Sequence, residues 1–285
     1  MFENCHHLCS SALKENVLCR CKEDYIVLWN TLLIASYVAE VKVYSLCLMS
    51  NHFHILLSGS GGQIETLVKT FKQMAGKYQM ERYSSSVIGG LKFQTFPIPD
   101  RRAFCREVAY ILRNPYASRI ANPFSYRWSS ADAYFSCRPE ASSPIGNLSL
   151  RKQRALFHTH RAMPSDWRIE SDGRIMPASV VDREYVERMF DNSSVGFFDL
   201  IRRWNLEDIV NESHGEEIVC AFSDDEVIKG IHNMCKDIFA VEKPQMLDRK
   251  SLATLVRKVY NRFGCPRAQL LRLLPVDNYF LDKLL

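Results

Sequence analysis

Two histidines separated by one residue interrupt an otherwise apolar stretch, LCLMSNHFHILL, at residues 46–57. In a strand, side chains alternate, so His52 and His54 are expected on one face while Phe53 and Ile55 point to the other. Two imidazoles on one face can approach a single divalent ion from neighbouring positions. The pattern alone leaves open the alternative of two ordinary buried histidines that hydrogen-bond to the backbone.

A tyrosine with polar neighbours follows on a helix predicted over residues 100–114. At about 100° per residue, Tyr110 lies roughly 145° from the mean direction of the helix's apolar side chains. Arg106 and Asn114 are its i−4 and i+4 neighbours on that polar side. A phenol, with a pKa near ~10, becomes a useful nucleophile when a cation or a metal helps it. A half-buried surface tyrosine is the alternative.

Four motifs occur in order within residues 4–136: MSNHFHILL, a basic amphipathic helix, AYILRNPYASRI and SYRWSS. In this combination the sequence resembles the REP-associated tyrosine transposases, a branch of the single-tyrosine HUH transposases. The resemblance implies an α+β fold with a ferredoxin-like or palm-like core. Its central antiparallel sheet, flanked by helices, would carry the two histidines, with the tyrosine helix packed beside them.

The resemblance also implies roles for individual residues. The HUH pair falls on His52 and His54, the nucleophile on Tyr110, and a third metal ligand on Asn114. Two imidazoles and one amide oxygen would leave positions for water and a DNA phosphate on Mg²⁺ or Mn²⁺. The WSS element that begins at Trp128 matches a family signature with a structural or DNA-contacting role.

The implied activity is that of a metal-dependent single-strand DNA endonuclease and strand transferase. It would form a 5′-phosphotyrosine intermediate on hairpin or repetitive DNA, without ATP. Two alternatives are a catalytically silent DNA-hairpin-binding protein or regulator derived from a transposase, and a metal-free protein-interaction module. The presence of all four site residues favours the enzyme. The sequence is compatible with a monomer or a homodimer.

The net charge of +5 is unevenly distributed. Between Gly61 and Ser130 there are eleven Lys/Arg and four Asp/Glu, an excess suited to a phosphate-binding surface. The candidates for contacting single-stranded or hairpin DNA are Lys72, Lys77, Arg101, Arg102, Arg106, Arg113 and the stacking residue Trp128. For each basic residue taken singly, a solvated position is the alternative.

The elements that must position these residues can be read from periodicity and turn signals. The sequence predicts a helix over 25–40, two strands or one bent strand within 41–57 that breaks around Ser50-Asn51, a helix over 63–83, and a short strand over 91–96. Asp100 is a plausible N-cap for the tyrosine helix. That helix is expected to end at Arg113 or Asn114, because Pro115 cannot easily continue it.

A domain boundary is predicted near residue 140. Residues 1–140 would form the HUH single-tyrosine catalytic domain, 141–226 an irregular or helical connector, and 227–285 a small helical domain. Eight acidic residues and no Lys/Arg within 206–226 predict a solvated connector or helix face. After an apolar stripe that stops at Gly264, short helices with seven Lys/Arg and no acid between Arg249 and Arg272 are compatible with a helix-turn-helix or another small helical module.

The cysteines and the hydropathy pattern bound the compartment. Ten cysteines without a CxxC pair predict reduced, mostly buried thiols. Cys5, Cys9, Cys19 and Cys21, with the histidines near them, are spaced irregularly, which favours chance clustering over a zinc site. Without a long apolar run or a signal-peptide pattern, a cytoplasmic protein with no membrane partner is expected.

Overall fold

The computed structural model describes residues 4–13, 16–118, 120–135, 142–203 and 222–284. Its main sheet has four antiparallel strands in the order β2-β3-β1-β4. These strands are β1 (Cys5–Ser10), β2 (Lys42–Leu48), β3 (Phe53–Ser58) and β4 (Phe93–Pro97). The two strands predicted within 41–57 are confirmed, and the chain turns between them at residues 49–52.

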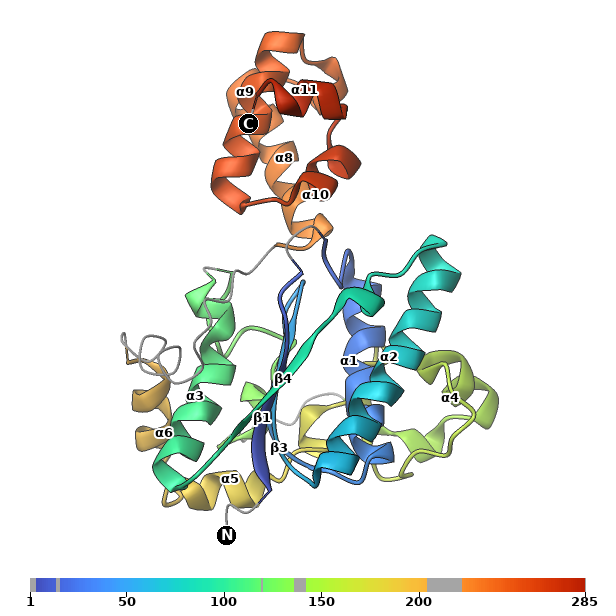
Figure 1. The fold of residues 1–285 in the computed structure, drawn as a ribbon, viewed down its shortest axis with the longest axis vertical. Helices are drawn as coiled ribbons and strands as arrows, with labels where there is room; N and C mark the ends of the chain where they lie inside the picture. Colours follow the sequence, from blue (N-terminus) through green and yellow to red (C-terminus); the bar gives the residue numbers. More distant parts are fainter. Residues whose placement is uncertain (1–3, 14–15, 119, 136–141, 204–221, 285) are drawn as a thin grey trace.

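Helices cover both faces of this sheet (Figure 1). α1 (Lys22–Val38) and α2 (Gly61–Tyr83) lie on one face, and α3 (Arg101–Ala117) lies on the other. On the first face the ring of Phe53 contacts Phe71 of α2, with 5.0 Å between centroids. On the second, the ring of Tyr44 contacts Phe104 of α3 at 5.2 Å. The mixed helix-and-sheet architecture confirms the expected α+β class.

Local sequence sets where α2 and α3 begin. Ser60 caps α2 in a capping box with Gln63, whose side chain in turn accepts from the Ser60 backbone N–H at 2.9 Å. Asp100 caps α3 by accepting from the Ala103 N–H at 2.8 Å, as predicted. The preceding β4 ends only three residues before α3, so the cap fixes the direction in which α3 leaves the sheet.

The predicted end of α3 before Pro115 is wrong, because the helix continues to Ala117. Proline removes one N–H donor, but the turn around it still closes through its neighbours. The Ser118 N–H donates to the Asn114 carbonyl at 3.1 Å, and the Ile120 N–H donates to the Pro115 carbonyl at 2.9 Å. Asn114 therefore lies within a regular helical turn.

Residues 142–203 pack onto the same hydrophobic core as the sheet. They contain β5 (Ser142–Pro144), α4 (Leu150–Phe157), β6 (Arg168–Glu170), α5 (Arg183–Met189) and α6 (Ser194–Ile201), with β5 and β6 paired in a small second sheet. Trp29 of α1 donates its indole N–H to the Ile175 carbonyl at 2.8 Å. This covering chain explains why α1 is apolar nearly all round.

Short 3₁₀ turns connect several of these elements. They are η1 (Ile88–Gly90), η2 (Ala131–Ala133), η3 (Ile145–Asn147), η4 (Pro177–Ser179) and η5 (Pro244–Met246).

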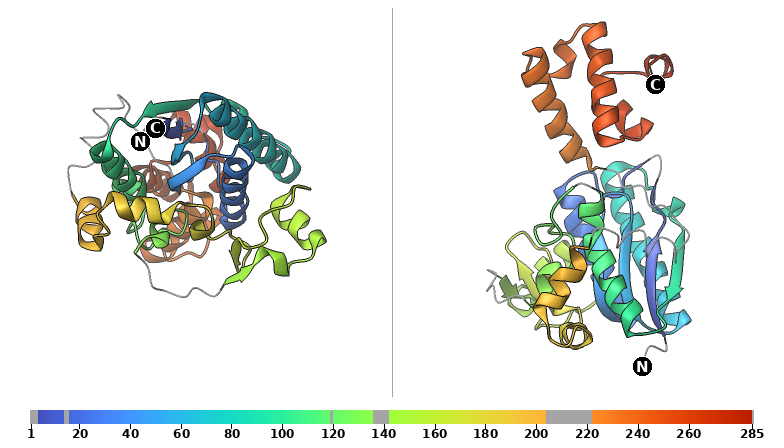
Figure 2. Two further views of the ribbon diagram at one scale, coloured as in Figure 1. Left: turned by 90° about the horizontal axis from the view of Figure 1, so that it is seen from below. Right: turned by 90° about the vertical axis from the view of Figure 1, so that its left-hand side faces the viewer.

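A second hydrophobic cluster lies in the C-terminal helices, which stand at one end of the sheet (Figure 1, Figure 2). They are α8 (Asp224–Phe239), α9 (Arg249–Phe263), α10 (Arg267–Leu273) and α11 (Asn278–Asp282). α9 ends at Gly264, whose φ of 57° gives the predicted left-handed cap. The first cluster extends as far as Ile201 along the chain, and the second begins at Val227.

One prediction concerns a segment that the structure describes only in part. Most of the acidic run at 206–226 lies outside the described residues, which omit 204–221. Among the residues that are described, no helix is long and apolar enough to span a membrane.

Candidate metal and tyrosine site

The two histidines of the HFH motif turn toward the same side of the sheet, the side covered by α3. His54 lies on β3, while His52 immediately precedes that strand. Their ring centroids are 4.9 Å apart and the ring planes meet at 88°. Both side chains are completely buried. The structure thus brings together the imidazoles that alternation predicted on one face.

Tyr110 and Asn114 extend from α3 toward these histidines. The Tyr110 ring lies edge-on to His54, with 5.6 Å between centroids, and the Asn114 amide interacts with the His52 side chain. Tyr110 is 4% exposed and Asn114 6%. The polar side of α3 that the sequence indicated therefore faces the buried histidines rather than solvent.

His52 is held in its neutral form. Burial lowers the pKa of His52 from 6.5 to about 4, and the contact with the Asn114 amide acts in the opposite direction. One ring nitrogen, Nδ1, lies 2.8 Å from the Asn51 Oδ1 and can donate to it. A neutral imidazole that donates through Nδ1 keeps a lone pair on Nε2, which is the form that ligates metals.

A chain of close polar contacts behind His54 was not predicted from the sequence. His7 of β1 places Nδ1 2.8 Å from the Glu107 Oε1 and Nε2 2.9 Å from the His54 Nδ1. With its proton on Nδ1, the nitrogen next to the Glu107 carboxylate, His7 accepts at Nε2. His54 then donates through Nδ1 and keeps its lone pair on Nε2. Glu107 and His7 thereby select the tautomer of His54.

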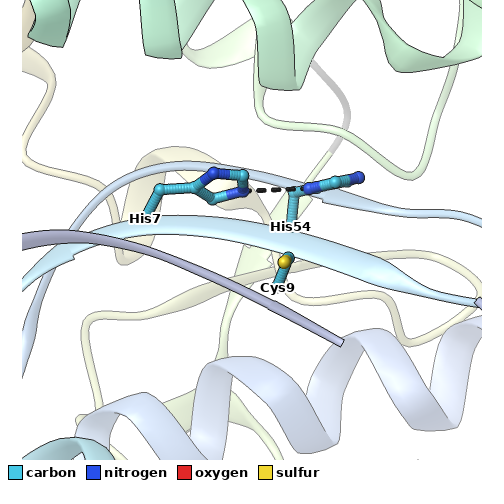
Figure 3. Close-up of side chains that lie close together, drawn as sticks. All are labelled: His7, Cys9 and His54. Carbon is cyan, nitrogen blue, oxygen red and sulfur yellow. Dashed lines mark hydrogen bonds between the residues drawn. The ribbon is translucent and has the colours of Figure 1, made fainter. Parts of the chain in front are cut away.

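Cys9 lies next to this chain (Figure 3). It pairs directly with His54 across β1 and β3, and it shares its face of β1 with His7. The ligand atoms of His7, Cys9 and His54 all lie within 4.8 Å of one another, and all three residues are buried. This group could hold a metal ion, which the irregular spacing of the N-terminal cysteines and histidines did not indicate.

The signal that could have found these residues is weak but present. His7 and Cys9 have the same alternation as His52 and His54, and β1 and β3 are both rich in apolar residues. Pairing the two motifs requires the strand order and register, which local sequence does not contain.

The predicted DNA-contacting residues are not gathered on one surface. Lys72 and Lys77 lie on α2, whereas Arg101, Arg102 and Arg106 lie on α3 across the sheet. Lys72 places its ammonium 5.0 Å from the Phe93 ring centroid at the β4 edge.

Two further predicted DNA contacts are buried within the fold. Arg113 is 6% exposed and donates to the Ile201 carbonyl at 2.8 Å. Trp128 stacks on Tyr25, with 4.9 Å between centroids and 10° between planes. Both side chains are used in packing α6 and α1 against the core.

No family model matches the chain, and no curated protein matches it. Among solved structures, the chain is similar to one described as "Structure of the REP associates tyrosine transposase bound to a REP hairpin". The similarity has a TM-score of 0.33 and 11% sequence identity, and it covers 45% of this chain and 76% of that chain. A likeness of this size carries no argument about activity or ligands.

Proposed function

We propose that this protein is a metal-dependent strand transferase for single-stranded DNA, acting on hairpin or repetitive elements. The observation that carries the proposal is the position of the Tyr110 phenol, whose ring lies 5.6 Å from that of His54, itself 4.9 Å from His52. The arrangement places a tyrosine nucleophile beside two imidazoles and an amide that can ligate a metal, and a metal can activate such a nucleophile and polarise its target. The ordered motifs quoted above support the same function.

The residues present fit a hard divalent ion. His52 is neutral because burial lowers its pKa to about 4, and the relay through His7 leaves a lone pair on Nε2 of His54. Asn114 adds an uncharged oxygen. We propose that His52, His54 and Asn114 hold Mg²⁺ or Mn²⁺, which would polarise the scissile phosphate and offset its developing negative charge.

The reaction follows from the chemistry of the phenol. The Tyr110 oxygen attacks the phosphorus of a phosphodiester, forming a new O–P bond and losing its proton. The bond to the 3′-oxygen breaks, and that oxygen takes up a proton to become a hydroxyl. The 5′ end remains attached as a phosphotyrosine, and attack by another 3′-hydroxyl reverses the step. ATP is not needed, because the phosphodiester energy stays in the phosphotyrosine bond.

The topology supports a ferredoxin-like core for this enzyme. The elements β1-α1-β2-β3-α2-β4 follow a βαββαβ order, and the sheet order is β2-β3-β1-β4. In such a core the central strands β1 and β3 are the rigid positions, and they carry His7, Cys9 and His54. A site built on central strands holds its ligands more firmly than one built on loops.

A second candidate is a DNA-hairpin-binding protein without strand-transfer chemistry, and the burial of the site favours it. His52 and His54 are completely buried, and Tyr110 is only 4% exposed. A phosphate can reach them only after the side chains over the site move. The enzyme therefore needs an opening step, whereas a silent binding protein needs none.

The deciding experiment is capture of the covalent intermediate. The full chain is incubated with Mn²⁺ and a labelled single strand that carries a hairpin, and the products are separated on a denaturing gel. The wild type should give a protein–DNA adduct, and Tyr110→Phe should give none. Tyr116→Phe is the matched control, since Tyr116 follows on the same helix but is 55% exposed.

Two results would count against the enzyme. An adduct that persists in Tyr110→Phe reassigns the nucleophile. Salt-sensitive hairpin binding with no adduct and no metal dependence favours the silent binding protein.

A further inference from the structure

His54 takes part in two different sets of potential metal ligands. The first set, which the proposed function uses, contains His52 and Asn114 beside Tyr110. In the second set, the His54 Nδ1 lies 2.9 Å from the His7 Nε2, and Cys9 pairs with His54 across the strands. The second set contains a thiol, which changes the kind of ion it prefers.

We propose that His7, Cys9 and His54 form a separate site for a thiophilic divalent ion such as Zn²⁺, and that its occupation silences the catalytic site. Thiolate and imidazole ligands suit Zn²⁺, whereas Mg²⁺ and Mn²⁺ prefer oxygen. The three potential ligand atoms lie within 4.8 Å of one another. They come from two hydrogen-bonded strands of the central sheet, as Figure 3 shows.

The two imidazole rings would need to move only slightly. Tetrahedral zinc with Zn–N near 2.0–2.1 Å places two nitrogens about 3.3 Å apart. The His7 Nε2 and His54 Nδ1 are 2.9 Å apart with a proton between them. An ion replacing that proton would move the rings apart by roughly 0.4 Å, by the same tetrahedral geometry.

The Glu107 carboxylate supplies the outer contact that a zinc-binding histidine usually has. Its Oε1 lies 2.8 Å from the His7 Nδ1. A proton on Nδ1, next to this carboxylate, leaves the lone pair of His7 on Nε2, the nitrogen 2.9 Å from the His54 Nδ1. Carboxylate–histidine–metal arrangements of this kind orient the ligand and strengthen it.

Silencing follows from the single lone pair of a neutral imidazole. Without zinc, a proton on Nδ1 of His54 leaves the lone pair on Nε2, which the proposed catalytic ion would use. When zinc binds Nδ1, that proton moves to Nε2, and the Cys9 thiol loses its proton to solvent. The Nε2–H can no longer ligate an ion beside His52. Zinc and the catalytic ion are therefore mutually exclusive, a conclusion that rests on the proposed function.

Cobalt substitution tests the site without DNA and without activity. Co²⁺ is added to the full chain, and the thiolate-to-cobalt charge-transfer absorption in the near ultraviolet is recorded. The band should be present in the wild type and lost in Cys9→Ala. It should remain in His52→Ala, which removes a ligand of the catalytic ion only.

A second cysteine beside His54 gives a matched control. Cys47 of β2 pairs with His54 from the opposite strand, but its Sγ is directed to the Met49 Sδ at 3.6 Å. Cys47→Ala should keep the band and the Zn²⁺ affinity. Cys9→Ala should weaken Zn²⁺, measured by competition with a chromogenic chelator, by at least about tenfold. Cys9→Ser repeats the test if the alanine variant is unstable.

Absence of the band in the wild type, or its persistence in both Cys9 variants, overturns the site. The silencing is tested by titrating Zn²⁺ into the adduct assay at fixed Mn²⁺. Wild-type adduct formation should be lost, and Cys9→Ala should need at least about tenfold more Zn²⁺. Equal sensitivity of the two proteins overturns the silencing. If no adduct forms in any protein, the proposed function fails, while the cobalt measurement still decides the zinc site.

Discussion

The Tyr110 ring stands edge-on to the His54 imidazole, with 5.6 Å between centroids and 84° between planes. The two residues come from α3 and β3, elements more than forty residues apart in sequence. Because the arrangement is built on a helix and a central strand, it is fixed by packing rather than by a loop. In the proposed function, metal binding then depends on which nitrogen of His54 carries the proton.

Removing a ligand on the catalytic side should weaken the binding of Mn²⁺. His52→Ala loses the neutral imidazole whose pKa burial lowers to about 4, and Asn114→Ala loses an uncharged oxygen. We expect each variant to bind Mn²⁺ at least about tenfold more weakly, by the mutational range known for metal sites. Electron paramagnetic resonance of Mn²⁺ measures this directly.

Two controls make the measurement specific. Asn114→Asp should keep or strengthen the affinity, because a carboxylate is a better ligand for Mn²⁺ than an amide. His232→Ala, an exposed position on α8, should leave it unchanged. Equal affinity in the wild type and in His52→Ala would remove His52 from the ligand set.

Glu107→Gln should change the tautomer of His54 through His7, which lies between the two residues. The carboxylate at 2.8 Å allows only donation from the His7 Nδ1, whereas an amide can also donate to it and reverse the chain. We expect a mixture of His54 tautomers and an affinity for Mn²⁺ about 10- to 100-fold lower. Nitrogen chemical shifts of the imidazoles report the tautomers. Glu65→Gln, exposed on α2, should change neither quantity. A single unchanged His54 tautomer in Glu107→Gln would show that the chain does not act.

Much of the fold could be predicted because its signals are local. The alternation through Phe53 predicted that His52 and His54 share a face, the Asp100 cap predicted the start of α3, and Gly264 predicted the end of α9. Each depends on residues within a few positions along the chain. The prediction at Pro115 was wrong because the backbone hydrogen bonds of Ser118, Ile120 and Ala121 close the turn around it.

The rest of the site depends on contacts between distant segments. His7 and His54 are 47 positions apart and meet only through the register of β1 against β3. Arg113 reads as a surface cation in the sequence, but the Ile201 carbonyl 88 positions later accepts its hydrogen bond. Sequence alone cannot tell a side chain used in packing from one used in the proposed site, because the difference depends on contact partners that lie far away along the chain.

The pair between Arg127 and Asp172 should make stability depend on pH. The guanidinium donates to both carboxylate oxygens, at 2.6 and 2.7 Å, and Lys22 lies 2.9 Å from the carboxylate. The Arg127 hydrogen bonds hold the pKa of Asp172 well below its usual 3.8, although partial burial opposes this. Because the pKa of Asp172 is lower in the folded protein, the unfolded chain binds a proton at a higher pH than the folded protein does. The stabilisation is therefore complete above pH about 4 and is lost as the pH falls below it.

Asp172→Asn isolates this contribution. It should lower the free energy of unfolding at pH 7 by about 1–2 kcal/mol, a range reduced for the partial exposure of the pair. The difference from the wild type should shrink as the pH falls from 4 toward 2. Urea denaturation at both ends of this range measures it, with the exposed Asp166→Asn as the control. A difference that is constant across pH would contradict an ionic origin.

Two glycine-to-alanine changes should have opposite effects on two parts of the chain. In α8, a Cβ on Gly230 would lie 2.2 Å from Cζ of Phe263, whose ring also contacts Phe222 at 5.2 Å. The crowded ring has to move within the second hydrophobic cluster, at a cost of about 1–3 kcal/mol. In α2, a Cβ on Gly76 would meet its nearest neighbour at an ordinary 3.8 Å. Gly76→Ala should therefore gain about 0.5–1 kcal/mol of helix stability.

The two effects can be read separately in the same full-length protein. Trp29, Trp128 and Trp167 all belong to the first hydrophobic cluster, so tryptophan fluorescence in a Trp204→Phe background follows that cluster, and hydrogen exchange of residues 222–284 follows the C-terminal helices. Gly230→Ala should speed exchange in α8 and α9 and leave the tryptophan transition in place. Gly76→Ala should raise the tryptophan transition and leave that exchange unchanged. A shift of both signals by either variant would mean that the two clusters unfold as one unit, because independent clusters confine each change to its own signal.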